Sequence, residues 1–136
     1  MSNKHKFAVV EKQFQYKGHD CICVFTRNGY RCGYVSTKVY HNFTDLDIDC
    51  HCGLSFSGTL PEEYVPKKQY YIGFDCGHSC DGLDTKLACV YGLIDDVEKE
   101  MFEQAFYYLE DCPVRDLKYV ENQCKKIADQ LEEIEQ

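Results

Sequence analysis

The chain has 136 residues, of which 44% are hydrophobic and 14% aromatic, and its formal net charge is −8. This length and composition suit one globular domain, residues 1–136, and exclude a disordered chain. Residues 1–94 contain ten acidic and ten basic residues, whereas residues 95–136 contain thirteen acidic and five basic ones. We therefore expect no DNA duplex as a partner, because nothing would neutralise phosphates along a groove.

The first half, residues 1–82, reads mainly as β-structure. Phe7–Tyr16 and Asp20–Arg27 are rich in Val, Phe, Ile and Cys, and Lys17-Gly18 suits a turn between them. Asn28-Gly29 then predicts a type I′ hairpin into a third strand at Tyr30–Thr37. Further along the chain, we expect a loop at Val39–Leu46 and short strands at Leu54–Ser57 and Gln69–Phe74.

The second half, residues 83–136, reads as helical and acidic. Asp95–Leu109 carries apolar residues at helical spacing, and Cys112-Pro113 ends that pattern. The last helix has apolar residues in a regular 3-4 alternation that is typical of a packing seam. They are Leu117, Val120, Cys124, Ile127, Leu131 and Ile134. This seam can pack on the sheet or on a second copy of the chain, so a homodimer or higher homo-oligomer is expected.

The predicted fold class is therefore α+β: an antiparallel sheet of four to six strands, followed by two C-terminal helices packed on one face. No apolar run has membrane-spanning length, so no membrane partner is expected. The start, MSNKHKFAVVEKQFQY, lacks the apolar stretch of a signal peptide, which predicts a cytoplasmic location.

Ten cysteines are present, and without an export signal we expect reduced thiols that serve mainly as small apolar residues. Cys21-x-Cys23, Cys50-His51-Cys52 and Cys76-x-His78-x-Cys80 contain metal-ligating residue types. None of them has the CxxC spacing of zinc knuckles and ribbons. We therefore expect no metal and no other cofactor. No Cys-protease signature surrounds any cysteine.

Two short segments concentrate polar side chains and glycine: DLDIDCHCGLSFSG at 45–58 and YYIGFDCGHSCD at 70–81. In an extended chain, Asp45, Asp47 and Asp49 share one side, while Leu46, Ile48 and Cys50 share the other. The three carboxylates could be a solvated face. Their continuation into His51-Cys52-Gly53 instead favours a site, because a titratable imidazole meets a flexible backbone there.

The second segment places Asp75, His78 and Asp81 on a tight loop after a strand. An aspartate can orient an imidazole through one ring nitrogen and leave the other to act as a base or donor. A structural hydrogen bond of a loop histidine is the alternative. Because both segments border short strands and are too polar for the core, we expect them to converge, with His51 and His78 on the same side of the fold.

Four blocks in this sequence resemble a family of small proteins encoded mostly by bacteriophages and prophages of Gram-positive hosts. The blocks are RCGYV at 31–35, DIDCHCGLSFSG at 47–58, YIGFDCGHSCD at 71–81 and YVENQCKKIADQL at 119–131. The family pattern is CGYV, DIDVHGGLT(F/Y)S, (W/Y)xGFDCAHxxD and an EYVxxE…QL helix, in this order. The chain departs from it at Cys52, where the family usually has Gly. The resemblance implies a phage origin and a role against bacterial defence, and it leaves the chemistry open.

Three functions follow as hypotheses. The first is a phage anti-defence protein that sequesters a small nucleotide immune signal, either cyclic ADP-ribose-type or a cyclic oligonucleotide, in the host cytoplasm. The second is a hydrolase or phosphodiesterase that uses His51, His78, Asp49 and Asp75, with or without a metal. The third is an inhibitor that binds a host defence protein through its acidic helices.

For the first hypothesis, the candidate ligand-binding residues come from the two polar segments. They are Asp47, Asp49, His51, Gly53, Ser55, Phe74, Asp75, His78 and Asp81. The plausible phosphate partners are few, and none lies in a diagnostic motif. They are Arg27, Arg31, Lys67, Lys68 and Lys86.

Overall fold

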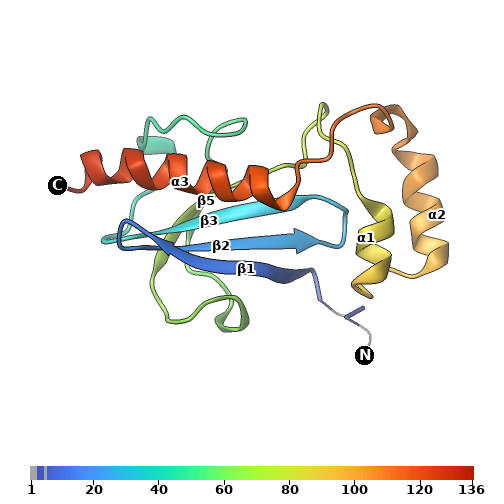
Figure 1. Ribbon diagram of the computed structural model, residues 1–136, viewed down its shortest axis with the longest axis horizontal. Helices are drawn as coiled ribbons and strands as arrows, with labels where there is room; N and C mark the ends of the chain where they lie inside the picture. Colours follow the sequence, from blue (N-terminus) through green and yellow to red (C-terminus); the bar gives the residue numbers. More distant parts are fainter. Residues whose placement is uncertain (1–2, 5) are drawn as a thin grey trace.

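Five antiparallel strands form one sheet in the order β1-β2-β3-β5-β4 (Figure 1). The computed structural model describes residues 3–4 and 6–136, so residues 1, 2 and 5 of the predicted domain lie outside this description. The α+β fold class predicted from the sequence is confirmed. The strands are β1 (Ala8–Tyr16), β2 (His19–Thr26), β3 (Arg31–Thr37), β4 (Phe56–Gly58) and β5 (Tyr70–Asp75).

The two hairpin turns differ from each other. Lys17 and Gly18 have φ of 51° and 82°, the pair of positive angles that a type I′ turn requires. At the second turn only Gly29 has a positive φ, 92°, and its N–H donates to the carbonyl of Thr26. The type I′ prediction for Asn28-Gly29 is therefore wrong: the turn is a three-residue loop with a glycine bulge. The N–H of Asp84, from a segment distant in sequence, donates to the carbonyl of Gly29 at 2.8 Å.

Helix α3 (Leu117–Ile134) covers one face of the sheet, over β1, β2 and β3 (Figure 1). The Asp116 side chain caps its first turn by accepting from the N–H of Tyr119. The predicted seam is confirmed as a packing surface, because its four central residues are fully buried against the strands. They are Val120, Cys124, Ile127 and Leu131. The apolar seam is thus buried within one chain, so its regular spacing no longer favours a homodimer.

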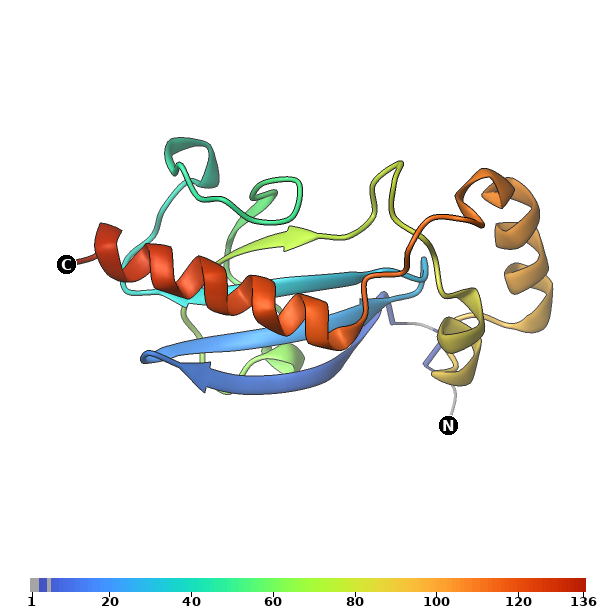
Figure 2. The ribbon, with the colours of Figure 1, turned by 45° about the horizontal axis from the view of Figure 1, so that its top comes forward.

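Two further helices, α1 (Thr85–Val90) and α2 (Asp96–Ala105), pack on each other beyond the end of the sheet (Figure 2). The expected helix after Asp95 is confirmed, with a capping box between Asp95 and Glu98. Its apolar residues Val97 and Met101, however, are 67% and 60% exposed. Helix α1 was not expected from the sequence, since six residues are too few to show a period.

The thiols behave as the sequence predicts. All ten cysteines are free, and six of them are buried: Cys21, Cys23, Cys32, Cys50, Cys76 and Cys124. Burial raises the pKa of the Cys32 thiol to about 12 and that of Cys50 to about 11. Cys32 and Cys50 are therefore apolar core side chains whose thiols stay protonated near neutral pH.

Candidate functional site

The two polar segments converge at one edge of the sheet, which confirms the expectation for His51 and His78. Because β4 and β5 are antiparallel, with Phe56 opposite Gly73, the chain entering β4 lies beside the chain leaving β5. Ser55 N–H extends this pairing by donating to the carbonyl of Gly73 at 2.9 Å. The rings of His51 and His78 lie 5.7 Å apart between their centroids.

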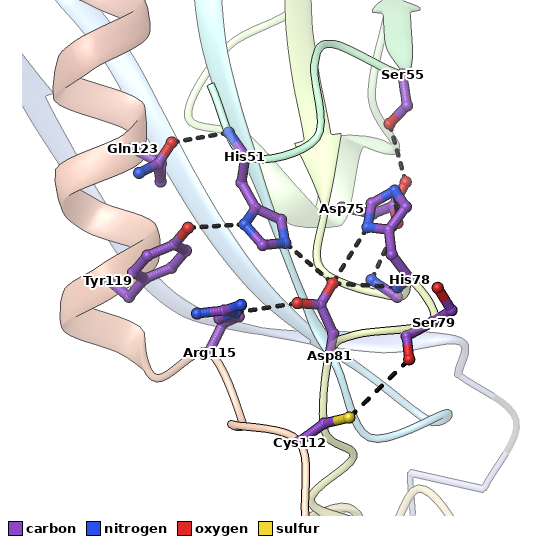
Figure 3. Close-up of polar contacts among 11 residues, drawn as sticks. His51, Ser55, Asp75, His78, Ser79, Asp81, Cys112, Arg115, Tyr119 and Gln123 are labelled. Carbon is purple, nitrogen blue, oxygen red and sulfur yellow. Dashed lines mark hydrogen bonds and ion pairs between the residues drawn. The ribbon is translucent and has the colours of Figure 1, made fainter. Parts of the chain in front are cut away.

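Side chains of α3 hold the first segment in place. The Gln130 side chain accepts from the N–H of Asp49 and donates to its carbonyl, both at 2.8 Å. Gln123 accepts from the N–H of His51 at 2.8 Å (Figure 3). These amides take the place of a neighbouring strand, so the extended segment before His51 is bound to a helix rather than to the sheet. Ile48 and Cys50 are buried and Asp45, Asp47 and Asp49 are exposed, as the alternation predicts.

Asp81 is the centre of the cluster and is completely buried. Its Oδ2 atom lies 2.9 Å from Nε2 of His51 and 3.1 Å from Nδ1 of His78. The same oxygen accepts from the backbone N–H of His78 at 3.1 Å, and Oδ1 accepts from Nε of Arg115 at 3.0 Å (Figure 3). Four donors from three segments therefore meet on one carboxylate.

These contacts determine the charge of Asp81 and the proton positions around it. Burial alone would raise the pKa of Asp81, but the hydrogen bonds from His51, Arg115 and His78 together hold that pKa below its ordinary value. Burial also raises the pKa of Tyr119, so its hydroxyl stays protonated. A charged Asp81 requires a proton on Nε2 of His51, and Nδ1 then accepts from the Tyr119 hydroxyl at 2.7 Å.

His78 is more accessible than His51, since its side chain is 35% exposed. Its Nε2 atom lies 3.6 Å from Oδ1 of Asp75, at the end of β5. Asp75 is oriented by Ser55, whose hydroxyl donates to Oδ2 at 2.9 Å, and by the N–H of Gly77, which donates to Oδ1 at 3.1 Å. Ser55, Asp75, His78, Asp81 and His51 thus form one connected network.

The remaining candidates from the sequence lie outside this network. Asp47 is exposed, and Asp49 forms an ion pair with Lys126 at 2.9 Å. Phe74 is buried in the core beneath α3. Gly53 follows His51 with a φ of 83° and open space around it.

Sequence reasoning missed three residues of the site: Arg115, Tyr119 and Gln123. All three come from α3 or the loop before it. The helical period and the block at 119–131 were the informative signals there, and neither assigns these side chains to the site. The Arg115 guanidinium also lies over the Tyr119 ring, 5.2 Å from its centroid. Two of the cations proposed as phosphate partners are instead paired elsewhere, Arg27 with Glu98 and Arg31 with Glu11.

A cavity of about 280 Å³ adjoins the network on the side of His78. Gly77 permits its shape, because a Cβ there would lie 2.8 Å from the Tyr30 ring. The lining is largely aromatic and apolar, with polar groups at its edge. It consists of Asn28, Tyr30, Gly77, His78, Ser79, Leu83, Phe106, Tyr108 and Leu109.

Cys52 is an exposed thiol beside the network and has a positive φ of 54°. Its pKa is raised, first by partial desolvation and then by the nearby carboxylate of Asp81. A raised pKa keeps the free thiol protonated, which opposes a role as a nucleophile.

Comparison of the chain with protein-family models, curated proteins and solved structures finds no match. None of the helices in residues 3–4 and 6–136 combines the length and apolar composition that crossing a membrane requires.

Proposed function

We propose that this protein binds a small nucleotide in the cavity beside His78 and retains it without converting it. The observation that carries the proposal is the aromatic lining of the cavity by Tyr30, Phe106 and Tyr108. Aromatic faces stack on nucleobases without a basic groove. A volume of about 280 Å³ lies just below the usual range of small-molecule sites and suits one base with its sugar, so the rest of a cyclic nucleotide would lie outside the cavity.

Polar groups at the edge of the cavity give the bound base or phosphate its orientation. The imidazole of His78 and the amide of Asn28 both line the cavity. Asp81 holds Nδ1 of His78 at 3.1 Å, so the ring is oriented before a ligand arrives. Orientation in advance reduces the entropy lost on binding.

Retention without conversion is favoured over hydrolysis because the catalytic groups do not surround the cavity. His78 lines it, whereas His51 is buried and has both ring nitrogens engaged. Asp49 is held by Lys126. The hydrolase alternative therefore has only one of its four proposed catalytic residues in the cavity lining, His78. The other three are His51, Asp49 and Asp75.

The resemblance to phage-encoded proteins supports the identity that we propose for the ligand, a nucleotide signal of a host immune system. Cyclic ADP-ribose and a cyclic dinucleotide represent the two candidate classes. Capture of such a signal in the host cytoplasm would blunt defence without any turnover.

The test is a capture-and-release experiment. The protein is mixed with cyclic ADP-ribose or a cyclic dinucleotide, filtered to remove free nucleotide, and heated. Chromatography should recover the intact nucleotide from the denatured protein. A cleaved product, or no retention of either nucleotide, would overturn the proposal.

Two neighbouring tyrosines provide a matched pair of variants. Tyr108 lines the 280 Å³ cavity and Tyr107 lines a different one, and both are exposed. Loss of one stacking ring costs about 1–3 kcal/mol. Tyr108→Ala should therefore weaken capture by about tenfold, whereas Tyr107→Ala should leave it unchanged.

A second candidate function, inhibition of a host defence protein, is favoured by a separate observation on α2. Val97 and Met101 form an exposed apolar stripe among acidic residues of the same helix. If this surface carries the function, the double variant Val97→Ser/Met101→Ser should abolish anti-defence activity in cells while nucleotide capture persists. Loss of activity with Tyr108→Ala alone would instead favour the nucleotide proposal.

A second copy of the chain is the other occupant of this stripe to test. If two copies pair through it, size-exclusion chromatography should show a smaller oligomer for the double variant.

A further inference from the structure

In the part of the chain that the structure describes, one group of metal-binding side chains stands together: His51, Cys52 and His78. Each offers one ligand atom, and the three atoms lie within 4.8 Å of one another. We infer that this group binds a zinc ion, and we add Asp81 as the fourth donor because its Oδ2 atom contacts both imidazoles. The inference goes beyond nucleotide binding and does not depend on it.

The absence of CxxC spacing does not exclude this set of ligands. That spacing belongs to sites whose cysteines come from one hairpin or knuckle, where two residues separate them. Here His51 and Cys52 precede β4 while His78 and Asp81 follow β5, and the pairing of these strands joins them.

Two of the donor distances approach those of a tetrahedral shell, and the sulfur of Cys52 lies within 4.8 Å of the imidazole ligand atoms. Asp81 Oδ2 lies 2.9 Å from Nε2 of His51 and 3.1 Å from Nδ1 of His78. With zinc bonds of about 2.0–2.1 Å, neighbouring donors of a tetrahedron are about 3.3 Å apart. A small outward shift of these side chains therefore makes room for the ion.

Each of the two imidazoles and the carboxylate already has an outer partner, as is usual for metal ligands. Tyr119 contacts Nδ1 of His51, Asp75 Oδ1 lies 3.6 Å from Nε2 of His78, and Arg115 donates to Oδ1 of Asp81. When zinc binds, each histidine proton moves to the outer nitrogen, toward Tyr119 or Asp75. The Cys52 thiol releases its proton to solvent.

The chemistry of the donors selects the metal. Two imidazoles, a thiolate and a carboxylate suit zinc, whereas magnesium prefers oxygen donors alone. The thiolate and the carboxylate together balance the double charge of the ion.

The backbone at Cys52 is a second, independent observation. Its φ of 54° is a conformation that a residue with a side chain seldom adopts and that glycine adopts freely. A cysteine in this place costs stability, and such strain concentrates at functional sites. A metal bond to its sulfur gives a physical reason for the thiol to be there.

The test uses the full chain, dialysed against a chelator and then titrated with zinc or cobalt alone. One metal per chain should bind, and cobalt should give tetrahedral absorption bands with a thiolate charge-transfer band. Cys52→Gly should lower the zinc affinity at least tenfold and abolish the thiolate band. This variant also relieves the backbone, so its melting temperature should not fall.

The matched control is Cys80→Ser, which removes an exposed neighbouring thiol outside the donor set. It should keep the affinity and the cobalt spectrum, and zinc should protect Cys52 from iodoacetamide in this variant. The inference would be overturned by octahedral cobalt without a thiolate band or by a lack of stoichiometric metal binding. It would also be overturned by a loss of zinc affinity that occurs only in Cys80→Ser. Nucleotide capture by the chelator-treated protein would be unaffected by any of these results.

Discussion

Nε2 of His51 lies 2.9 Å from Oδ2 of Asp81, although the two residues are thirty positions apart and belong to different loops. Both side chains are buried, and the carboxylate has no contact with water. This one contact joins the chain that enters β4 to the chain that leaves β5. It also links Tyr119 of α3, which contacts His51, to His78 in the lining of the cavity.

Asp81→Asn should destabilise the protein by about 3 kcal/mol. A neutral amide loses the charge that binds Arg115, and its NH₂ group faces ring N–H groups that then lack an acceptor. Urea unfolding in the presence of a chelator measures the free energy. The control is Asp49→Asn, which removes an exposed ion pair with Lys126 and should cost less than about 1 kcal/mol. Equal effects of the two variants would contradict the central role of Asp81.

Gly77→Ala should deform the cavity. The added Cβ would meet the Tyr30 ring at 2.8 Å, so either the ring or the loop must move. We expect a loss of about 1–2 kcal/mol in the free energy of unfolding and weaker nucleotide capture. Gly18→Ala is the control, because a φ of 82° strains an alanine there while open space surrounds it. If Gly18→Ala weakened capture as much as Gly77→Ala, general destabilisation would explain the result.

Ile127→Asp should unfold or strongly destabilise the chain, by about 3 kcal/mol or more, since it buries an unpaired charge under α3. The control is Ile134→Asp, because Ile134 lies on the same helix and is 44% exposed. This substitution should change the free energy of unfolding by less than about 0.5 kcal/mol. Thermal melting with size-exclusion chromatography checks both. A folded Ile127→Asp protein with a reduced oligomeric state would show that α3 serves an interface instead.

Stability should fall in alkaline solution because of the buried thiols. Burial raises the pKa of Cys21 from 9.0 to about 12 in the folded protein. The contribution of the neutral thiol is therefore complete below pH 9 and is lost as the pH rises toward 12. At a pH of about 10.5, ionisation of this one thiol should lower the free energy of unfolding by about 1–2 kcal/mol. Urea unfolding of Cys21→Ala should show a shallower decline over this range, and an equal decline would contradict the assignment.

Local pattern was sufficient for most of the fold. Segments rich in Val, Phe, Ile and Cys between turn residues predicted four of the five strands closely, and the apolar seam predicted which face of α3 could be buried. Both signals lie within a few neighbouring positions of the chain. The type I′ turn at Asn28-Gly29 was a wrong prediction because a glycine with positive φ also suits a three-residue loop with a bulge, so the dipeptide alone does not select between the two turns. The stripe of Val97 and Met101 was visible in the sequence, but only packing decides whether a stripe is covered.

For the site, the sequence by itself determined the two polar segments and all five members of the network: His51, Ser55, Asp75, His78 and Asp81. Their residue types and glycine neighbours were enough to single them out. Only the tertiary structure decided which partners they have. Arg115, Tyr119 and Gln123 enter the site because α3 crosses the sheet beside β3, and Asp49 and Phe74 are left outside it. Contacts between residues distant in sequence depend on how helix and sheet pack, and no local pattern encodes that arrangement.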